Sequence, residues 1–349
     1  MNAAYQSIVG ARNEERRDLF LGAARRLGAT VQNIEKDFWV CWTLDALFNG
    51  LQAGGPRLLF KGGTSLSKAF GLIDRFSEDI DITVFRDDLG AGATVEELEA
   101  LSGKKRRAKL DAIKAACQAY LNGPLYIQLD KQISETMQAA GVAADHYRLE
   151  ADPADSDRQT LLFWYPAVTT RAGDYVRSAV KIESGAKSAL DPHVSASVKP
   201  YVTEELPELD LEVANVTTVD PGRTFWDKIV ILHGLRQWYD RRGEIRQGGQ
   251  RVSRHHYDVF KLLQAKAVEG WVSDRALAVD CARHAQMFFN SADLDLARAI
   301  PGTFTLTPSA PMREPLRRDF EAMAGMIFGN PPDFDSVLSA IAALEARLN

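Results

Sequence analysis

The stretch KGGTSLSKAFGLIDRFSEDIDITVF, residues 61–85, decides the fold of this chain. Near its end, residues 79–84 alternate carboxylates with apolar residues as Asp-Ile-Asp-Ile-Thr-Val. Because residues i and i+2 of a strand point to one face, Asp79 and Asp81 are predicted to share a face, with the apolar residues on the other. Paired carboxylates with phosphate oxygens suit Mg²⁺. The alternative is an edge strand whose polar face meets water.

The beginning of the stretch predicts a phosphate-binding turn. Gly62 and Gly63 follow an apolar, strand-like run over residues 58–60 and let the backbone come close to a ligand. Thr64 or Ser65 is predicted to cap a helix, and a helix N-terminus offers free N–H groups to a phosphate. The pattern is not a Walker A loop. Joined to Asp-x-Asp, it indicates a phosphate-binding turn beside a metal-binding strand.

These two motifs together carry a family resemblance. KGGTSLSK followed by RFSEDIDI resembles the AbiEii/AbiGii toxin family, nucleotidyltransferase-like proteins that include the MenT toxins and fall within the polymerase-β-like nucleotidyltransferase superfamily. The resemblance implies an α/β (α+β) fold, with a mixed sheet and helices followed by a C-terminal helical domain. We predict domains over residues 1–212 and 213–349, with the active-site cleft between them.

Composition limits the classes of function. The chain has 349 residues, 46% hydrophobic and 26% charged, with a formal net charge of −5. An acidic balance argues against a general nucleic-acid coat, so RNA contact would need a local basic patch. Cys41, Cys117 and Cys281 lack a Cys-x-x-Cys spacing and are predicted to be buried and free. No apolar run approaches the ~20 residues that cross a bilayer, and no signal peptide is seen, which predicts a cytoplasmic protein without a membrane partner.

Periodicity predicts the remaining elements. We expect helices over residues 11–27 and 34–42, strands over 124–130 and 160–165, and irregular or edge-strand structure over 185–211. Within the second helix region, Glu35, Lys36 and Asp37 alone would be a solvated turn, although the family resemblance places this segment near the active site. The part that follows residue 212 is predicted to be predominantly helical.

A second chemical strand is predicted over residues 175–184, YVRSAVKIES. Alternation places Lys181 and Glu183 on one face. A lysine beside a metal–triphosphate site would balance phosphate charge, whereas the alternative is an ion pair with Glu183 or a neighbour. The resemblance favours Lys181 as a catalytic and triphosphate contact, and Glu183 as a further carboxylate.

Residues 218–235, TVDPGRTFWDKIVILHGL, predict a helix that begins at Arg223 or Thr224. Asp227 and Lys228 would then lie in its first turn, where an Asp often only complements the helix dipole. The resemblance instead assigns a catalytic role to Asp227 and a nucleotide-binding role to Lys228.

Two basic segments are candidates for RNA contact. KKRRAK, residues 104–109, is either a solvated helix face or a phosphate contact. Residues 236–256 hold six arginines interleaved with aromatic residues, a pattern that suits unpaired nucleotides but also an exposed loop. Arg254 and Asp258, at i and i+4, are predicted to share a helix face, where a buried structural ion pair explains them as well as a catalytic role does. The predicted RNA-binding residues are Arg241, Arg242, Arg246, Arg251 and Arg254.

The resemblance, rather than the spacing, implies the biology. It implies a nucleotidyltransferase toxin of a bacterial toxin–antitoxin system that transfers nucleotides from an NTP to RNA, with the tRNA 3′ end as the expected acceptor, and so blocks translation. The expected cofactor is Mg²⁺ or Mn²⁺ on Asp79 and Asp81, and the expected partner is a cognate antitoxin. The predicted phosphate-lining residues are Gly62, Gly63, Thr64, Ser65, Ser77, Lys181 and Lys228. The alternatives are nucleotidyl or phosphoryl transfer to a protein or small molecule, or a non-catalytic nucleotide-binding interaction module.

Overall fold

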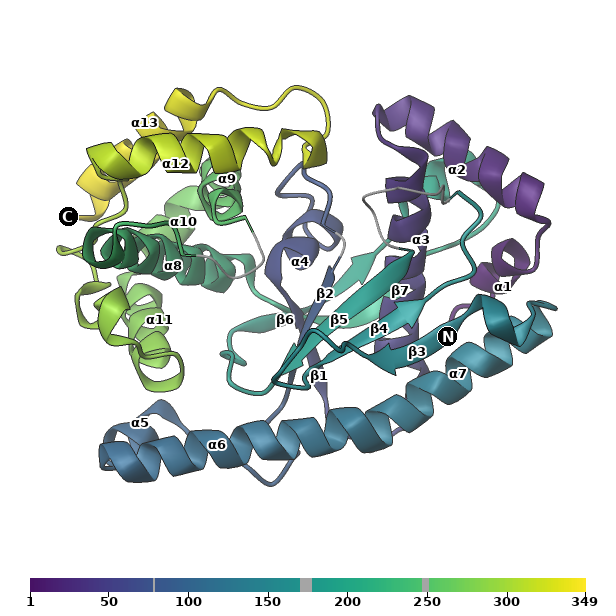
Figure 1. Ribbon diagram of the computed structural model, residues 1–349, viewed down its shortest axis with the longest axis horizontal. Helices are drawn as coiled ribbons and strands as arrows, with labels where there is room; N and C mark the ends of the chain where they lie inside the picture. The colour runs from purple at the N-terminus through teal and green to yellow at the C-terminus, as the bar shows by residue number, and fades with distance from the viewer. Residues whose placement is uncertain (78, 170–177, 247–250) are drawn as a thin grey trace. The chain divides into compact units, whose positions relative to one another are not determined.

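The structure, a computed structural model, describes residues 1–77, 79–169, 178–246 and 251–349. The chain forms two compact units (Figure 1). The first comprises Met1–Phe70, Phe76–Ala93 and Arg107–Val219, and the second comprises Gly71–Arg75, Thr94–Arg106 and Asp220–Asn349. The division into functional domains at residues 212 and 213 stays a prediction.

The first unit is built on one seven-stranded sheet with the order β3-β4-β5-β2-β1-β7-β6. The sheet is mixed, because β2 runs parallel to β5 and β1 runs parallel to β7, while the other neighbours are antiparallel. This confirms the predicted mixed α/β fold. The strands are β1 Leu58–Lys61, β2 Asp79–Val84, β3 Arg148–Ala151, β4 Thr160–Trp164, β5 Ala179–Gly185, β6 His193–Val198 and β7 Val213–Val219.

One face of this sheet is covered by helix α3, which lies behind the strands in Figure 1. Trp39 and Trp42 of α3 pack on Phe163 of β4, with ring centroids 5.8 and 5.3 Å apart, and all three side chains are fully buried. The helices of this unit are α1 Ala4–Val9, α2 Asn13–Leu27, α3 Val31–Asp45, α4 Gly62–Lys68 and α7 Tyr126–Ala139, together with most of α6 Gly103–Tyr120.

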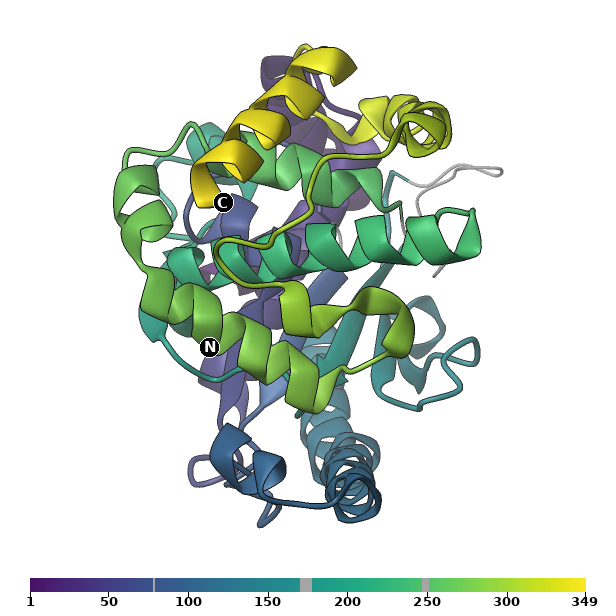
Figure 2. The ribbon, with the colours of Figure 1, turned by 90° about the vertical axis from the view of Figure 1, so that its left-hand side faces the viewer.

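The second unit contains helices, and no strand is assigned among its described residues. Helix α8 runs across the middle of this unit and contacts α9, α10 and α11 (Figure 2). The predicted helical character of the C-terminal part is therefore confirmed. The helices are α5 Val95–Glu99, α8 Pro221–Arg242, α9 Ser253–Leu262, α10 Val268–Ser273, α11 Arg275–Phe288, α12 Ala310–Glu321 and α13 Phe334–Leu348.

The strand predicted over residues 124–130 is wrong. A π-helical turn over Leu121–Leu125 leads directly into α7. Leu125, Leu129 and Ile133 are all fully buried, and their spacing of four residues is that of one helix face. Ile127 imitates strand alternation with its neighbours but is 67% exposed. A short apolar run does not distinguish the two periods.

The other predicted elements of the first unit are confirmed. Helices α2 and α3 cover the two helical regions, β4 covers the strand predicted over 160–165, and β6 is an edge strand within 185–211. The strand β5 begins at Ala179, whereas residues 175–177 of the predicted strand lie outside the described residues. The three cysteines are buried and free, as expected. Among the described residues, no helix has the length and apolar composition that a bilayer crossing requires.

Candidate active site

The two carboxylates of β2 lie on one face of the sheet. Asp79 and Asp81 are half-buried, whereas Ile80 and Ile82 between and beyond them are fully buried on the opposite face. The predicted alternation is therefore confirmed. Strand β2 is also a central strand rather than an edge strand, because it pairs with β1 on one side and β5 on the other. The alternative of an edge strand facing water is wrong.

Strand β5 places a lysine and a third carboxylate on the same face. Lys181 lies opposite Asp79 and Glu183 lies opposite Asp81 in the parallel register. Lys181 Nζ forms a short ion pair with Glu183. Burial opposes the charged form, but the hydrogen bond that Lys181 donates to Glu183 and the charges of Glu183 and Asp79 raise the pKa of Lys181 above its ordinary value. The ion pair predicted as an alternative is present, and it leaves the lysine charged beside Asp79.

Strand β1 adds a second lysine that was not predicted. Lys61, the last residue of β1, lies opposite Asp81, and its Nζ is 3.7 Å from Asp81 Oδ1. Both side chains are half-buried. The available signal was its place at the end of an apolar run, immediately before the glycine pair. Its partner could not be known without the strand register.

Gly62 permits the closest approach in the site. Its φ is +81°, and a Cβ built there would lie 2.2 Å from Asp81 Oδ2. The Asp81 carboxylate therefore occupies the space above Gly62 that any other residue would fill. This contact joins the predicted glycine turn directly to the predicted metal strand. Gly63 follows as the second residue of α4.

Thr64 and Ser77 hold the helix against the strand. The Thr64 hydroxyl donates to the main-chain oxygen of Asp79 at 2.5 Å and lies 2.7 Å from Ser77 Oγ. Because Thr64 has a single hydroxyl proton, Ser77 must donate to Thr64. The predicted capping role is wrong: α4 already begins at Gly62, so Thr64 and Ser65 lie within it, and Ser65 donates back to the Gly62 oxygen.

The donor set fits a hard divalent cation. Asp79 and Asp81 supply carboxylate oxygens on one face, and the missing Cβ of Gly62 lets the Asp81 carboxylate lie directly against the glycine turn. Among the described residues no group of three or more potential metal ligands is assembled. This agrees with the usual Mg²⁺ mode, in which one or two carboxylates bind the ion together with substrate phosphates and water.

The segment Glu35-Lys36-Asp37 is buried rather than a solvated turn. Asp37 Oδ1 is 2.6 Å from Lys68 Nζ at the end of α4, and both side chains are 4% exposed. The Lys68 ammonium also lies 3.6 Å from the ring centroid of Tyr201, whose main-chain N–H donates to Asp37. This ion pair fixes α4, which carries Gly62, to α3. Sequence reasoning missed it because Asp37 and Lys68 are separated by 31 positions.

Asp227 and Lys228 belong to the second unit and differ in environment. Helix α8 begins at Pro221 with Asp220 as its N-cap, so both residues lie in the second turn of the helix. The prediction that they lie in the first turn is wrong. The Asp227 side chain is 41% exposed and lies 3.3 Å from Arg223. Lys228 is buried, with its Nζ 2.7 Å from Asp258 Oδ2. Their functional roles stay predictions.

Asp258 is the centre of a buried charge network. It receives a bidentate contact from Arg75, at 2.7 and 2.9 Å, in addition to that from Lys228. Burial would raise the pKa of Asp258, but the two cations lower it far below its ordinary value. A buried ionic role for Asp258 is therefore present, with Arg75 and Lys228 as the partners that the contacts identify, whereas sequence spacing suggested Arg254.

The predicted RNA-binding arginines mostly contact carboxylates of their own unit. Arg242 Nη2 is 2.5 Å from Asp293, and Arg251 Nη1 is 3.9 Å from Asp319. The guanidinium of Arg246 lies 5.4 Å from the ring centroid of Trp238. Arg241 donates a hydrogen bond to the main-chain oxygen of Ala292. Arg254 lies in α9. Their RNA contacts stay predictions.

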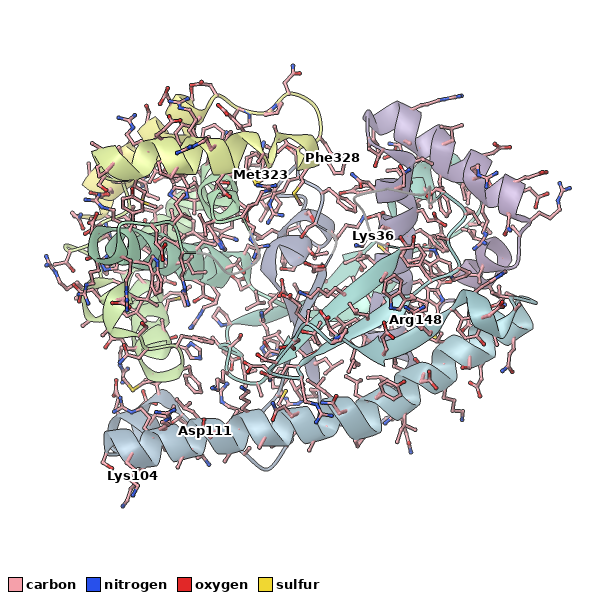
Figure 3. All side chains as sticks on the ribbon, viewed as in Figure 1. Lys36, Lys104, Asp111, Arg148, Met323 and Phe328 are labelled. Atoms are coloured by element: carbon pink, nitrogen blue, oxygen red, sulfur yellow. The ribbon has the colours of Figure 1, made fainter. Side chains whose placement is uncertain are left out.

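The basic run at residues 104–109 forms part of α6, with Lys104, Lys105 and Arg107 exposed, and Lys104 points away from the helix in Figure 3. Arg106 instead donates to the Leu98 oxygen. The helical part of the prediction is confirmed, and contact with a phosphate backbone stays a prediction.

Comparison with known proteins identifies a family and a solved structure with a similar fold. A family model described as nucleotidyl transferase AbiEii toxin, type IV TA system, matches residues 45–340. The solved structure of MenT4, a nucleotidyltransferase toxin from Mycobacterium tuberculosis H37Rv, has a TM-score of 0.50 and 14% sequence identity, covering 94% of this chain and 89% of that chain. At this identity the likeness shows the fold alone. Among curated proteins, none matches in sequence.

Proposed function

The chain belongs to the AbiEii family of nucleotidyltransferase toxins of type IV toxin–antitoxin systems, and on this premise we propose that β1, β2 and β5 carry a metal-dependent site that transfers nucleotides from an NTP to RNA. One observation carries the proposal: Asp79 and Asp81 share one face of β2, and the Asp81 carboxylate lies directly against Gly62. Membership of the family supports an enzyme. That the site uses a metal ion, an NTP and an RNA acceptor is what we propose.

Asp79 and Asp81 would hold Mg²⁺ or Mn²⁺. Both carboxylates are hard oxygen donors, and they are half-buried, so a cation between them would relieve their mutual repulsion. When bound, the ion would polarise the phosphate oxygens and stabilise the charge of the departing pyrophosphate.

The turn at Gly62 and Gly63 would receive the triphosphate, with Ser65 in the same turn. Lys61 and Lys181 flank the carboxylates from both neighbouring strands and would neutralise phosphate charge. The hydroxyl groups of Thr64 and Ser77 are used to hold α4 on β2, so they would shape the turn in which the phosphates lie.

The proposed step is an in-line displacement at the α-phosphorus. The 3′-hydroxyl oxygen of the RNA forms a bond to that phosphorus, the bond between the α-phosphorus and the bridging oxygen breaks, and pyrophosphate leaves. The hydroxyl proton is released to water. The residues named above position the phosphates and balance their charge, which is the main source of rate enhancement in reactions of this kind.

For the second unit we propose roles that rest on the family resemblance. Asp227 would act in catalysis, and Lys228 would support nucleotide binding, with its ion pair to Asp258 as the contact that fixes it. The arginines proposed to contact the acceptor are Arg241, Arg242, Arg246, Arg251 and Arg254.

The proposed acceptor is the 3′ end of tRNA. Nucleotides added there would prevent aminoacylation and so block translation. A toxin of a type IV system implies an antitoxin as its partner. The alternative is transfer to an acceptor that is not RNA, either a protein or a small molecule.

The test is incubation of the protein with total RNA, Mg²⁺ and each α-labelled NTP in turn, with Asp79→Asn and a chelator as controls. We expect label in RNA with the unmodified chain and at least about a hundredfold less with Asp79→Asn. Label in protein only would replace RNA as the acceptor. Equal labelling of RNA by Asp79→Asn would overturn the site.

A further inference from the structure

The sheet face that carries the carboxylates continues beyond β5 to the edge of the sheet. On β4, Leu162 lies opposite Lys181 and Trp164 lies opposite Ala179. On β3, Arg148 lies opposite Trp164. Directly opposite residues share a face, so Trp164 and Arg148 point to the same side as Asp79 and Asp81. The other face of the sheet is the one that α3 covers.

Trp164, Arg148 and Glu150 form one connected cluster on this face. The Arg148 guanidinium lies 4.4 Å from the Trp164 ring centroid. The indole N–H of Trp164 donates to Glu150 Oε1 at 2.6 Å, and Arg148 Nε donates to Glu150 Oε2 at 3.2 Å. The Trp164 ring is therefore fixed by one carboxylate and stacked on one cation, although it is only half-buried. Arg148 itself is exposed and is labelled on the sheet in Figure 3.

The cluster lies within reach of the proposed phosphate site. Trp164 is two strands from Asp79, about 10 Å across the sheet, and two residues further along, about 7 Å. This is the span of a single nucleotide, from the phosphate at one end to the base at the other. Both ends are on one face of one sheet within the first unit.

We propose that Trp164 and Arg148 form a stacking platform for an unpaired nucleobase, a proposal that rests on the function proposed above. Indole rings and guanidinium planes are the side chains on which unpaired bases stack. The charge of the cluster argues for a base and against a phosphate, because Glu150 neutralises Arg148 and would repel an anion. A carboxylate also accepts hydrogen bonds from the amino and imino groups of bases.

The base has two possible sources with the same chemistry: the incoming NTP or the 3′-terminal nucleotide of the acceptor. Kinetics distinguish them. We expect Trp164→Leu to raise KM about tenfold or more for whichever substrate stacks there, with little change for the other. Arg148→Ala is expected to change the same KM in the same direction. The conservative Trp164→Phe should restore most of the loss, since a phenyl ring also stacks.

Arg57 provides a matched control. Its guanidinium lies 4.3 Å from the Phe85 ring centroid and is paired with Asp88, so it is a second exposed arginine stacked on an aromatic ring in the same unit. Arg57→Ala is expected to leave both KM values unchanged. An equal effect of Arg57→Ala and Arg148→Ala would reduce the cluster to a general stabilising contact and overturn the platform.

A binding measurement separates this inference from the proposed function. Tryptophan fluorescence is titrated with the 5′-monophosphates of adenosine, cytidine, guanosine and uridine, comparing the unmodified chain with Trp164→Phe. We expect a quenching component, with at least one nucleotide, that Trp164→Phe abolishes, even if no transfer to RNA is found. Identical titrations of the two proteins together with unchanged KM values for both substrates would overturn the inference. Thermal unfolding of Trp164→Leu checks its fold, and Trp164→Phe and Arg148→Ala decide the question if that variant is unstable.

Discussion

At the scale of single residues, the contact between Gly62 and the Asp81 carboxylate determines what the site can bind. Gly62 has a left-handed backbone conformation, and Asp81 Oδ2 occupies the position that a Cβ would need. The glycine therefore has two separable functions: it adopts a positive φ, and its missing side chain allows Asp81 to come close. Several other glycines, Gly54 among them, have the left-handed backbone without a close neighbour at the Cβ position.

Gly62→Ala is expected to lower transfer activity about a hundredfold, because the new methyl group must displace the Asp81 carboxylate. It should also cost about 1–2 kcal/mol of unfolding free energy through the positive φ. Gly54 is the matched control, since its φ is +83° and nothing lies within 4 Å of its built Cβ. Gly54→Ala should show a similar loss in urea unfolding with full activity. Equal activity of the two variants would mean that the approach of Asp81 to residue 62 does not matter.

Asp79→Asn keeps the size of the side chain and removes its charge. We expect kcat to fall about a hundredfold or more, since the carboxylate pair is proposed to hold the metal, and urea unfolding to change little. Asp145→Asn, at a side chain that is 82% exposed, is the control. Activity is measured over a range of Mn²⁺ concentrations. If Asp79→Asn is as active as the control at every concentration, Asp79 is not a metal ligand.

At the scale of elements, α4 is fixed from both sides. Thr64 ties its first turn to β2, and Lys68 ties its end to Asp37 of α3. The glycine turn is therefore held by contacts from two neighbouring elements. A shift of α4 would move Gly62 relative to Asp81.

Lys68→Met is expected to destabilise the protein by about 3–5 kcal/mol, because it leaves the Asp37 carboxylate buried without its cation. Adding Asp37→Asn should recover much of that loss, since neither position of the pair then carries a charge. Urea unfolding of the two single variants and the double variant gives the coupling. Purely additive effects would show that the two side chains do not act as a pair.

A helix or strand could be predicted where the spacing of apolar residues fitted either the helical period or the strand period, but not both. The alternation of residues 79–84 and the helix over residues 11–27, observed as Asn13–Leu27, were predicted because each shows one clear pattern. The run over residues 124–130 satisfied both periods, and only its continuation to Ile133 shows the helix face. Helix starts were wrong where several capping residues followed one another, as at Asp220 and Thr224.

The site itself was predictable in part for a related reason. Asp79, Asp81 and the glycine pair lie in one stretch of sequence, so their proximity follows from a short connection. Lys61 opposite Asp81, and Asp37 with Lys68, depend on strand register and on long-range packing. Sequence spacing carries no information on either. The role of Asp227 rests on the family resemblance and stays a prediction.

At the scale of the whole molecule, buried histidines are expected to make stability depend on pH. His256 is fully buried in α9, and burial lowers its pKa from 6.5 to about 4, although the Val252 main chain and Asp319 act in the opposite direction. Above pH 6.5 the ring is neutral in both states. Below pH 6.5 the unfolded chain takes up a proton at His256 and the folded chain does not, so the protein becomes less stable as the pH is lowered.

The expected loss from His256 is about 1.4 kcal/mol per pH unit between pH 6.5 and 4, or about 3 kcal/mol in total. His256→Phe should remove this part of the slope, measured by urea unfolding at several pH values. His146→Gln, at a side chain that is 65% exposed, is the control. A slope that is the same in His256→Phe and the unmodified chain would contradict the burial of an uncharged ring.

The reaction proposed for the whole molecule is defined by which phosphate of the NTP reaches the acceptor. The most direct measurement supplies the protein with tRNA, Mg²⁺ and the preferred NTP in two parallel reactions, one labelled at the α-phosphate and one at the γ-phosphate. We expect the α label in tRNA and the γ label in pyrophosphate, with both signals lost in Asp79→Asn. Label from the γ-phosphate in the tRNA, or α label in tRNA that Asp79→Asn does not diminish, would contradict nucleotidyl transfer by the Asp79–Asp81 pair.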